Sequence, residues 1–359
     1  MQYLCKGLII FLIYKIMKIV CDNKVRFLGN VFDGIADTIF VPGRDITPEI
    51  VHDADALIVR TRTNCNKNLL NNSAVKFIGT ATIGYDHIDT NYCEQNHIFW
   101  TNAPGCNSGS VCQYIASVLV NVSTHYGIDL KTKTIGVIGA GHVGAKVIKA
   151  AKLLGMNVLV NDPPLLLSGN KEYDFCSLVY LLQHSDFVDI HVPYTASGEF
   201  ATHHLCNNAF ISKMKDGAVL INSSRGAVAD NQAVLTALTN KKLLTAVLDV
   251  WENEPDINRE LLNRVFIGTP HIAGYSVDGK ANATMQIVRS LSKFFNLGLD
   301  NWTPDTSDYQ GFSLNYDNVA DFESVIQSYN VLADSQLLKT SPEKFEYFRE
   351  NYPTRRERL

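Results

Sequence analysis

One segment of the chain, between residues 134 and 162, constrains the fold more than any other. A strand, a glycine-rich turn, a helix and a second strand are expected there in that order, at Thr134–Ile138, Gly139–Gly144, Ala145–Leu154 and Val158–Asp162. The apolar runs have the length of strands, and Gly155 follows the helical stretch as a helix-ending glycine usually does. This order predicts a βαβ unit, and a βαβ unit predicts a parallel sheet covered by helices.

Short apolar runs alternate with helix-like stretches along most of the remaining chain. Beyond a first strand that starts at Met17, further strands are expected at residues 56–59, 75–79, 97–100, 187–192, 218–222, 244–248 and 265–268. Pro104 and Gly105 interrupt the pattern, and Ser110–Tyr126 then predicts a long helix. The alternation is typical of a doubly wound α/β sheet, and a length of 359 residues agrees with two or three domains.

The glycine turn indicates a ligand because a strand precedes it and a helix follows it. Gly139 allows a sharp turn, Gly141 lets the backbone approach a pyrophosphate, and Gly144 lets the helix and strand pack closely. His142 and Val143 stand in this turn, just before the N-terminus of the helix, whose free backbone N–H groups attract phosphates. The turn therefore predicts a dinucleotide site. The alternative is a glycine turn that binds no cofactor.

An acidic residue, Asp162, closes the second strand of the same unit. A carboxylate at that position accepts hydrogen bonds from the ribose hydroxyls and repels a 2′-phosphate. The sequence therefore favours NAD over NADP.

Composition excludes several classes of protein. Apolar residues make up 46% of the chain and charged residues 19%, which is the balance of a globular protein and not of a disordered one. The formal net charge of -4 argues against a broad basic surface. We therefore expect no nucleic-acid partner.

The cysteines are scattered along the chain, at positions 5, 21, 65, 93, 106, 112, 176 and 206. They form no C-x-x-C pair, and no His-x3-His or H-E-x-x-H cluster accompanies them. This spacing predicts unpaired thiols in the reducing cytoplasm and no metal site.

The apolar beginning of the chain is interrupted by Lys15 and Lys18, and no small-residue cleavage site follows it. The run is also too short to span a bilayer. We expect translation to start at Met17, which makes residues 1–16 an upstream extension, and we expect no membrane association. The alternative is a membrane anchor.

Polar residues of three kinds follow the predicted strand ends in the second half of the chain. Arg225 follows residues 218–222, an acid follows residues 244–248, and His271 follows residues 265–268. Ligands of open α/β sheets bind outside the carboxyl ends of the strands, so these groups are expected to converge near a nicotinamide. Histidine ordinarily exchanges a proton near neutral pH and arginine binds carboxylates, so a proton-transfer group and a carboxylate-binding group are expected together.

These segments resemble the D-isomer-specific 2-hydroxyacid dehydrogenase family. The stretches that carry the resemblance are Gly79–Gly84, Ala103–Asn107, Asn161–Pro164, His271–Ser276, Gly279–Lys280 and the ending Asn351–Glu357. The similarity extends from Met17 to the end of the chain. It implies a Rossmann-type doubly wound sheet that binds NAD, a flavodoxin-like α/β substrate domain and a small C-terminal dimerisation region, hence a homodimer.

The resemblance also implies roles for individual residues. Arg225, Glu254 and His271 become the catalytic triad, with Arg225 on the substrate carboxylate, His271 as base and Glu254 as the partner of His271. Glu252 competes with Glu254 for the acidic role. Asp249 is expected to contact the nicotinamide amide. The remaining residues implied are Gly274 for the cofactor and Thr61, Thr82 and Tyr275 for the substrate. Candidates for a substrate phosphate are Arg44, Arg60, Arg62 and Lys280, and the sequence does not choose among them.

The expected domains follow from the same resemblance. Residues 17–107 and about 275–298 form the substrate domain, residues 108–274 the NAD domain, and residues 299–359 the dimerisation region. The end of the chain, from Ser341, has the composition of a charged helix. His191 follows a strand and is expected either to line the cofactor cleft or to pack in the core.

The resemblance implies oxidation of 4-phospho-D-erythronate at C2 to 2-oxo-3-hydroxy-4-phosphobutanoate, a step in pyridoxal 5′-phosphate formation. A 2-keto acid is expected to reoxidise the cofactor. The alternatives are a phosphoglycerate, glycerate or hydroxypyruvate dehydrogenase of the same family, or a non-catalytic NAD-sensing interaction protein.

Overall fold

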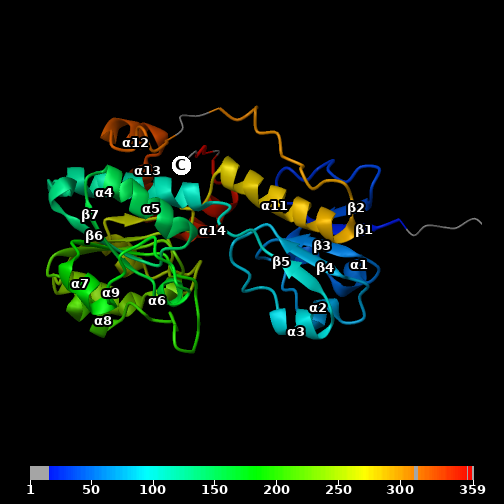
Figure 1. Cartoon of the computed structure of the whole chain (residues 1–359), viewed down its shortest axis with the longest axis horizontal. Coiled ribbons are helices and arrows are strands. Elements are labelled where there is room, and N and C mark those ends of the chain that lie inside the picture. Colours follow the sequence, from blue (N-terminus) through cyan, green and yellow to red (C-terminus); the bar gives the residue numbers. More distant parts are fainter. Residues whose placement is uncertain (1–15, 311–313, 354, 358–359) are drawn as a thin grey trace, which may run out of the picture. The chain divides into compact units, whose positions relative to one another are not determined.

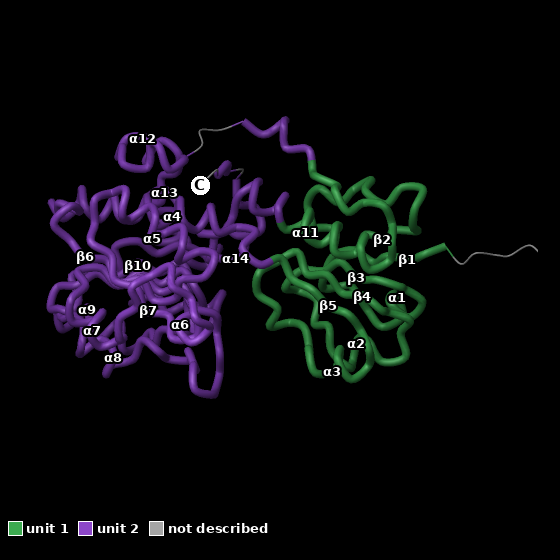
Figure 2. Tube along the Cα trace, viewed as in Figure 1, with its two compact units in different colours: residues 1–103, 283–304 green, residues 104–282, 305–359 purple. Residues whose placement is uncertain are grey.

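The computed structural model describes residues 16–310, 314–353 and 355–357. The chain forms two compact units: unit 1 takes in residues 1–103 and 283–304, and unit 2 takes in residues 104–282 and 305–359 (Figure 2). The boundaries expected from the sequence lie within eight residues of these divisions. The last segment, 305–359, belongs to unit 2 and is not a compact unit of its own. Residues 1–15, which include most of the expected upstream extension, lie outside the described part of the chain.

Unit 1 contains a five-stranded parallel sheet with the order β2-β1-β3-β4-β5. Its strands are β1 (Lys18–Asp22), β2 (Asp37–Val41), β3 (Ala56–Val59), β4 (Phe77–Thr80) and β5 (Phe99–Thr101). Helices α1 (Pro48–Val51), α2 (Lys67–Leu70) and α3 (Thr90–Gln95) pack on one face, and the second half of α11 (Val277–Phe295) packs on the other. This strand order is the flavodoxin-like order, as the resemblance implied.

Unit 2 contains a six-stranded parallel sheet with the order β11-β10-β9-β8-β6-β7. Its strands are β6 (Thr134–Ile138), β7 (Asn157–Asn161), β8 (Phe187–Ile190), β9 (Ala218–Asn222), β10 (Leu243–Leu248) and β11 (Ile267–Gly268). Phe175 forms an isolated parallel bridge beside β7 and takes the place of one more strand. Counted with that bridge, the strand order is Rossmann-like. The chain adds strands outward from β6 on one side and then outward from β8 on the other, so the point between β6 and β8 is where the strand order reverses.

Helices cover both faces of the unit 2 sheet (Figure 1). Helices α4 (Ser108–Tyr126) and α5 (His142–Leu153) pack on one face. The other face carries α7 (Leu178–His184), α8 (Asn208–Lys213), α9 (Asn231–Thr239) and α10 (Arg259–Arg264). Alternate side chains of each strand enter the two cores, which is why the strands are apolar without interruption.

Helix α4 is buried along almost its whole length because it lies between the sheet and the first two of the three C-terminal helices (Figure 1). Those helices are α12 (Phe322–Ser328), α13 (Val331–Thr340) and α14 (Phe345–Glu350), while the short helix α6 (Pro163–Leu167) follows β7. No helix among the described residues combines the length and the hydropathy that a membrane span requires.

The end of the chain differs from the expected charged helix. Helix α14 ends at Glu350, and Pro353 follows three residues later, where a proline disfavours helix in the residue before it. Arg355, Arg356 and Glu357 are buried, at 7%, 8% and 6% exposure. Their charges therefore belong to the interior of unit 2.

Candidate active site

The glycine turn of unit 2 has the geometry that a dinucleotide requires. Gly139 has a φ of 90°, and a Cβ there would lie 2.5 Å from the carbonyl oxygen of His191. A Cβ on Gly144 would lie 1.9 Å from the carbonyl oxygen of Gly139. The close packing of helix and strand therefore leaves no room for a side chain at Gly144. A Cβ on Gly141 would meet nothing within 4 Å. The turn is therefore closed toward the protein at Gly139 and Gly144 and open to a ligand at Gly141.

Helix α5 begins directly after Gly141, and no side chain caps its N-terminus. The His142 side chain lies beside Gly105, and Val143 packs against the core below α5. The uncapped first turn leaves the partial positive charge of the helix available to an anion.

Asp162 connects the turn to the end of β7. Its Oδ2 accepts a hydrogen bond of 2.8 Å from the Ala140 N–H, and its Oδ1 accepts one of 2.9 Å from the Leu165 N–H. Each carboxylate oxygen has a second lone pair, so Asp162 keeps acceptor capacity for ribose hydroxyls. The same carboxylate also holds the turn, a role that no local sequence pattern indicates.

Arg225 lies in a tight loop after β9. Its Nη1 donates to the Ser224 carbonyl at 2.8 Å, while the Asn222 side chain donates to the Arg225 carbonyl at 3.1 Å. A Cβ on the next residue, Gly226, would lie 1.8 Å from the carbonyl oxygen of Trp251. The Arg225 loop is therefore packed against the loop that carries the acidic residues.

Glu254 and His271 form a direct pair. Nδ1 of His271 lies 2.8 Å from Oε2 of Glu254, and the Trp251 N–H donates to Oε1 of Glu254 at 2.9 Å. Burial works to raise the pKa of Glu254, but the charge and hydrogen bond of His271, the Trp251 N–H and the charge of Arg349 together hold that pKa below its usual value. Glu254 therefore stays ionised beside the imidazole.

Glu252, the competing acid, has other partners. Its Oε1 lies 2.7 Å from Nε2 of His204, and its Oε2 accepts from the Asn231 N–H at 2.9 Å. The structure thus brings Glu254 to His271 and directs Glu252 elsewhere.

Asp249 is buried at 1% exposure and holds the loop that carries His271. Its carboxylate accepts hydrogen bonds from the Thr269 hydroxyl, the Ile272 N–H and the Ala273 N–H, at 2.7, 2.8 and 3.0 Å. Burial raises the pKa of Asp249, and nearby His271 and these hydrogen bonds oppose that rise. The contact with a nicotinamide amide stays a prediction, whereas the contact with this loop is observed.

Gly274 and Tyr275 continue the same loop. A Cβ on Gly274 would lie 2.1 Å from Nδ2 of Asn107, so a larger residue there requires the Asn107 side chain to move. The ammonium of Lys280 lies 5.0 Å from the centre of the Tyr275 ring. Of the four basic residues considered for a phosphate, Lys280 is the one in unit 2.

The two predicted threonines belong to unit 1, at the carboxyl ends of neighbouring strands: Thr61 follows β3 and Thr82 follows β4. The same edge carries the three remaining basic candidates, Arg44, Arg60 and Arg62. Thr82 belongs to a hydrogen-bonded chain in which its hydroxyl donates to the Gly84 carbonyl at 2.8 Å and lies 2.7 Å from the hydroxyl of Thr80.

His87 completes this chain, with Nε2 3.0 Å from the Thr80 hydroxyl. The Thr82 hydroxyl donates its only hydrogen to the Gly84 carbonyl, so the Thr80 hydroxyl must be the donor to Thr82. Nε2 of His87 must then donate to the Thr80 hydroxyl. Burial lowers the pKa of His87 to about 4. Sequence reasoning missed His87, although it follows the glycine-threonine stretch by three residues.

His191 packs in the core. Its side chain is 2% exposed, and Nε2 lies 2.8 Å from Oδ2 of the fully buried Asp189. Of the two roles open for His191, lining the cofactor cleft or packing in the core, the structure supports packing in the core. Within the described residues, no group of three or more His, Cys, Asp or Glu side chains is placed to hold a metal ion.

Comparison with known proteins gives a consistent result. The sequence model of the NAD binding domain of the D-isomer specific 2-hydroxyacid dehydrogenases matches residues 115–273. An erythronate-4-phosphate dehydrogenase of Bacteroides fragilis is 46% identical over 344 residues, which cover 95% of this chain and 97% of the relative. One from Escherichia coli is 40% identical over 350 residues, with coverages of 95% and 92%. The crystal structure of D-lactate dehydrogenase from Aquifex aeolicus complexed with NAD and lactic acid superposes with a TM-score of 0.64 at 26% identity, covering 79% of this chain and 96% of that one.

Proposed function

The chain belongs to the D-isomer specific 2-hydroxyacid dehydrogenase family, and from this premise we propose that it oxidises 4-phospho-D-erythronate at C2, with NAD as the oxidant. The observation that carries the proposal is 46% identity over 97% of the length of an erythronate-4-phosphate dehydrogenase. The product is 2-oxo-3-hydroxy-4-phosphobutanoate. Turnover of the purified protein on this substrate tests the proposal, and its absence in the presence of NAD and a 2-keto acid would contradict it.

The residues of unit 2 fit NAD. The open face at Gly141 and the uncapped start of α5 receive the pyrophosphate, and Asp162 receives the ribose hydroxyls. When bound, NAD accepts the hydride from C2 of the substrate.

His271 is the base for the substrate hydroxyl. A carboxylate can only accept hydrogen bonds, so Nδ1 of His271 carries the hydrogen toward Glu254 and Nε2 presents a lone pair. Nε2 takes the hydroxyl proton as the hydride leaves C2, which leaves a carbonyl group and an imidazolium. The ionised Glu254 stabilises that imidazolium and fixes the ring.

Arg225 binds the substrate carboxylate. Its guanidinium offers paired donors for two carboxylate oxygens and polarises the forming carbonyl oxygen. The loop contacts of Asn222 and Gly226 hold its backbone in place.

The substrate phosphate needs cationic partners, and the carboxyl edge of the unit 1 sheet carries three of the four candidates. Arg44, Arg60 and Arg62 stand there with Thr61 and Thr82. Guanidinium and hydroxyl groups are donors suited to a phosphate, which supports a phosphorylated 2-hydroxy acid as the substrate.

We further propose a cytoplasmic homodimer. The cysteines among the described residues are free thiols, and most are buried, as suits a reducing compartment. The dimer rests on the resemblance, which implies an interface formed by segment 305–359, and the C-terminal helices expose Leu337 and Tyr347 there, at 54% and 61%. The Glu254–His271 pair argues against a purely NAD-sensing protein, which has no use for a proton-transfer histidine.

A further inference from the structure

The loop that carries His271 is held in a strained conformation. His271 has a φ of 57°, in the left-handed region that residues with a large side chain rarely adopt. Such strain persists where the surrounding structure fixes the backbone from several sides. One side is the end of β10, where the Asp249 carbonyl accepts from the His271 N–H at 2.7 Å and the Asp249 carboxylate accepts from the Ala273 N–H at 3.0 Å.

The other side is the C-terminal tail, defined here as residues 355–357. Nη2 of Arg355 donates to the Ala273 carbonyl at 2.6 Å, and the Arg355 carbonyl accepts from the Val277 N–H at 2.8 Å. The N–H and the carbonyl of Ala273 are therefore held by two elements far apart in sequence, Asp249 and Arg355. Ala273 is only two residues from His271.

Arg355 is itself held by aromatic rings. Its guanidinium lies 4.1 Å from the centre of the Tyr329 ring and 5.9 Å from that of Tyr352, and both tyrosine hydroxyls donate to Asp334 at 2.6 Å. Nε and Nη1 of Arg355 are buried and make no hydrogen bond. The two rings thus fix the position of the Arg355 guanidinium, and its shortest hydrogen bond, through Nη2, goes to the loop that carries His271.

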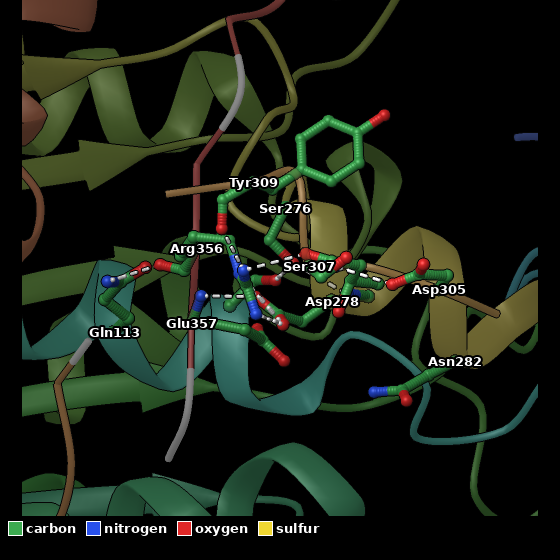
Figure 3. A network of polar contacts seen from close by, with 12 residues as sticks. Gln113, Ser276, Asp278, Asn282, Asp305, Ser307, Tyr309, Arg356 and Glu357 are labelled. Carbon is green, nitrogen blue, oxygen red and sulfur yellow. Dashed lines mark hydrogen bonds and ion pairs between the residues drawn. The ribbon is translucent and has the colours of Figure 1, made fainter. Parts of the chain in front are cut away.

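The next two residues fasten the tail to the start of α11 (Figure 3). Arg356 donates through Nε and Nη2 to the Asp278 carboxylate at 3.0 and 2.9 Å, and also to the Tyr309 carbonyl. The Glu357 N–H donates to Asp278 at 2.7 Å. Asp278 stands in the first turn of α11, just after the His271 loop. Arg356 thus sets the position from which Arg355 reaches Ala273.

We propose that Arg355 is a positioning residue for His271: the C-terminal tail keeps the loop in its strained conformation, so that the imidazole stays aligned with Glu254. This inference rests on the proposed role of His271 as the base. It gives the end of the chain a direct part in the reaction, although no tail residue contacts the reacting atoms.

The test compares Arg355→Met, Arg355→Lys and Lys339→Met in the full chain. Lys339 is a matched control because it also comes from the C-terminal helices and donates to two backbone carbonyls, those of Val265 and Phe266, at 2.6 and 3.0 Å. The carbonyls of Val265 and Phe266 precede β11, whereas Ala273 follows it, so Lys339 does not hold the loop that carries His271. The readouts are kcat, KM, the Kd of NAD, and amide hydrogen exchange of a peptide that covers residues 271–277.

Arg355→Met should lower kcat about 10- to 100-fold, the effect of misplacing a catalytic group by about 1 Å, and should speed exchange in residues 271–277. The Kd of NAD should rise by a smaller factor than kcat falls, because the glycine turn is untouched. Arg355→Lys keeps one cationic donor group and should recover part of kcat. Lys339→Met should leave both kcat and the exchange in residues 271–277 as in the wild type.

Unchanged kcat, or unchanged exchange in residues 271–277, would overturn the proposal. If Arg355→Met does not fold, Asp278→Asn replaces it, because that variant removes the charge that holds Arg356. Unchanged kcat or unchanged exchange in Asp278→Asn would then overturn the proposal. A wild-type protein without turnover would contradict the proposed function instead. In that case the exchange measurement alone decides whether the tail holds the loop.

Discussion

Nδ1 of His271 lies 2.8 Å from Oε2 of Glu254, and this contact determines which nitrogen of the ring can act as a base. Because the carboxylate accepts, Nε2 is left with the lone pair. Besides the buried His191–Asp189 pair, the same unit contains a second pair of this kind, Nε2 of His204 and Oε1 of Glu252 at 2.7 Å. The second pair uses the opposite nitrogen, which makes it an internal control.

Replacing His271 by Gln should lower kcat about 10²- to 10⁴-fold, the usual contribution of a general base. NAD binding should be nearly unchanged, because the glycine turn does not depend on the imidazole. Steady-state kinetics and NAD titration of His271→Gln and His204→Gln, side by side, check this. Equal losses of kcat in the two variants would remove His271 from its role.

Two glycines of the turn should respond in opposite ways to substitution by Ala. In Gly144→Ala the new Cβ would fall 1.9 Å from the Gly139 carbonyl oxygen, so the free energy of unfolding should drop by about 1–3 kcal/mol. In Gly141→Ala the Cβ meets no protein atom, so the fold should be retained while the Kd of NAD rises. Thermal unfolding and NAD titration distinguish these effects. A Gly141→Ala variant that binds NAD like the wild type would place the pyrophosphate elsewhere.

Asp162→Asn should weaken the preference for NAD over NADP. The amide oxygen can still accept from one backbone N–H, but the charge that repels a 2′-phosphate is gone. We expect the ratio of the two Kd values to shift about tenfold toward NADP, equivalent to roughly 1.4 kcal/mol. An unchanged ratio would mean that the carboxylate serves only to hold Ala140 and Leu165.

His87 should make the protein sensitive to acid. Its pKa falls from 6.5 to about 4 in the folded state because of burial, so the unfolded chain binds more protons between these values. Stability should therefore be greatest above pH 6.5 and decline as the pH falls toward 4. His87→Gln keeps a donor for Thr80 without the titration, so its urea midpoint should fall less between pH 7.5 and 5. Parallel declines in the two proteins would contradict this.

Much of the fold followed from local patterns, while the contacts of the site did not. The strands of the βαβ unit were predicted within one residue, because turn glycines and apolar runs are local signals. Glu252 and Glu254 are two positions apart in one loop, and only tertiary packing assigns one to His204 and the other to His271.

The C-terminal tail shows the same limit more clearly. The charges of Arg355, Arg356 and Glu357 indicate a solvated helix, since such side chains are seldom buried. Their burial depends on Asp278, on Tyr329 and on backbone carbonyls far away in the sequence. No periodicity or spacing in the chain carries that information.

The most direct test of the proposed function compares turnover of the purified protein on 4-phospho-D-erythronate and on 3-phospho-D-glycerate. Each assay contains NAD and 2-oxoglutarate, and the keto and hydroxy acid products are measured directly, so that tightly held cofactor does not hide turnover. We predict a kcat/KM at least about 100-fold higher for the four-carbon substrate. A preference for the three-carbon acid would contradict the proposed substrate while leaving the family intact, and no turnover of either would contradict the proposed function.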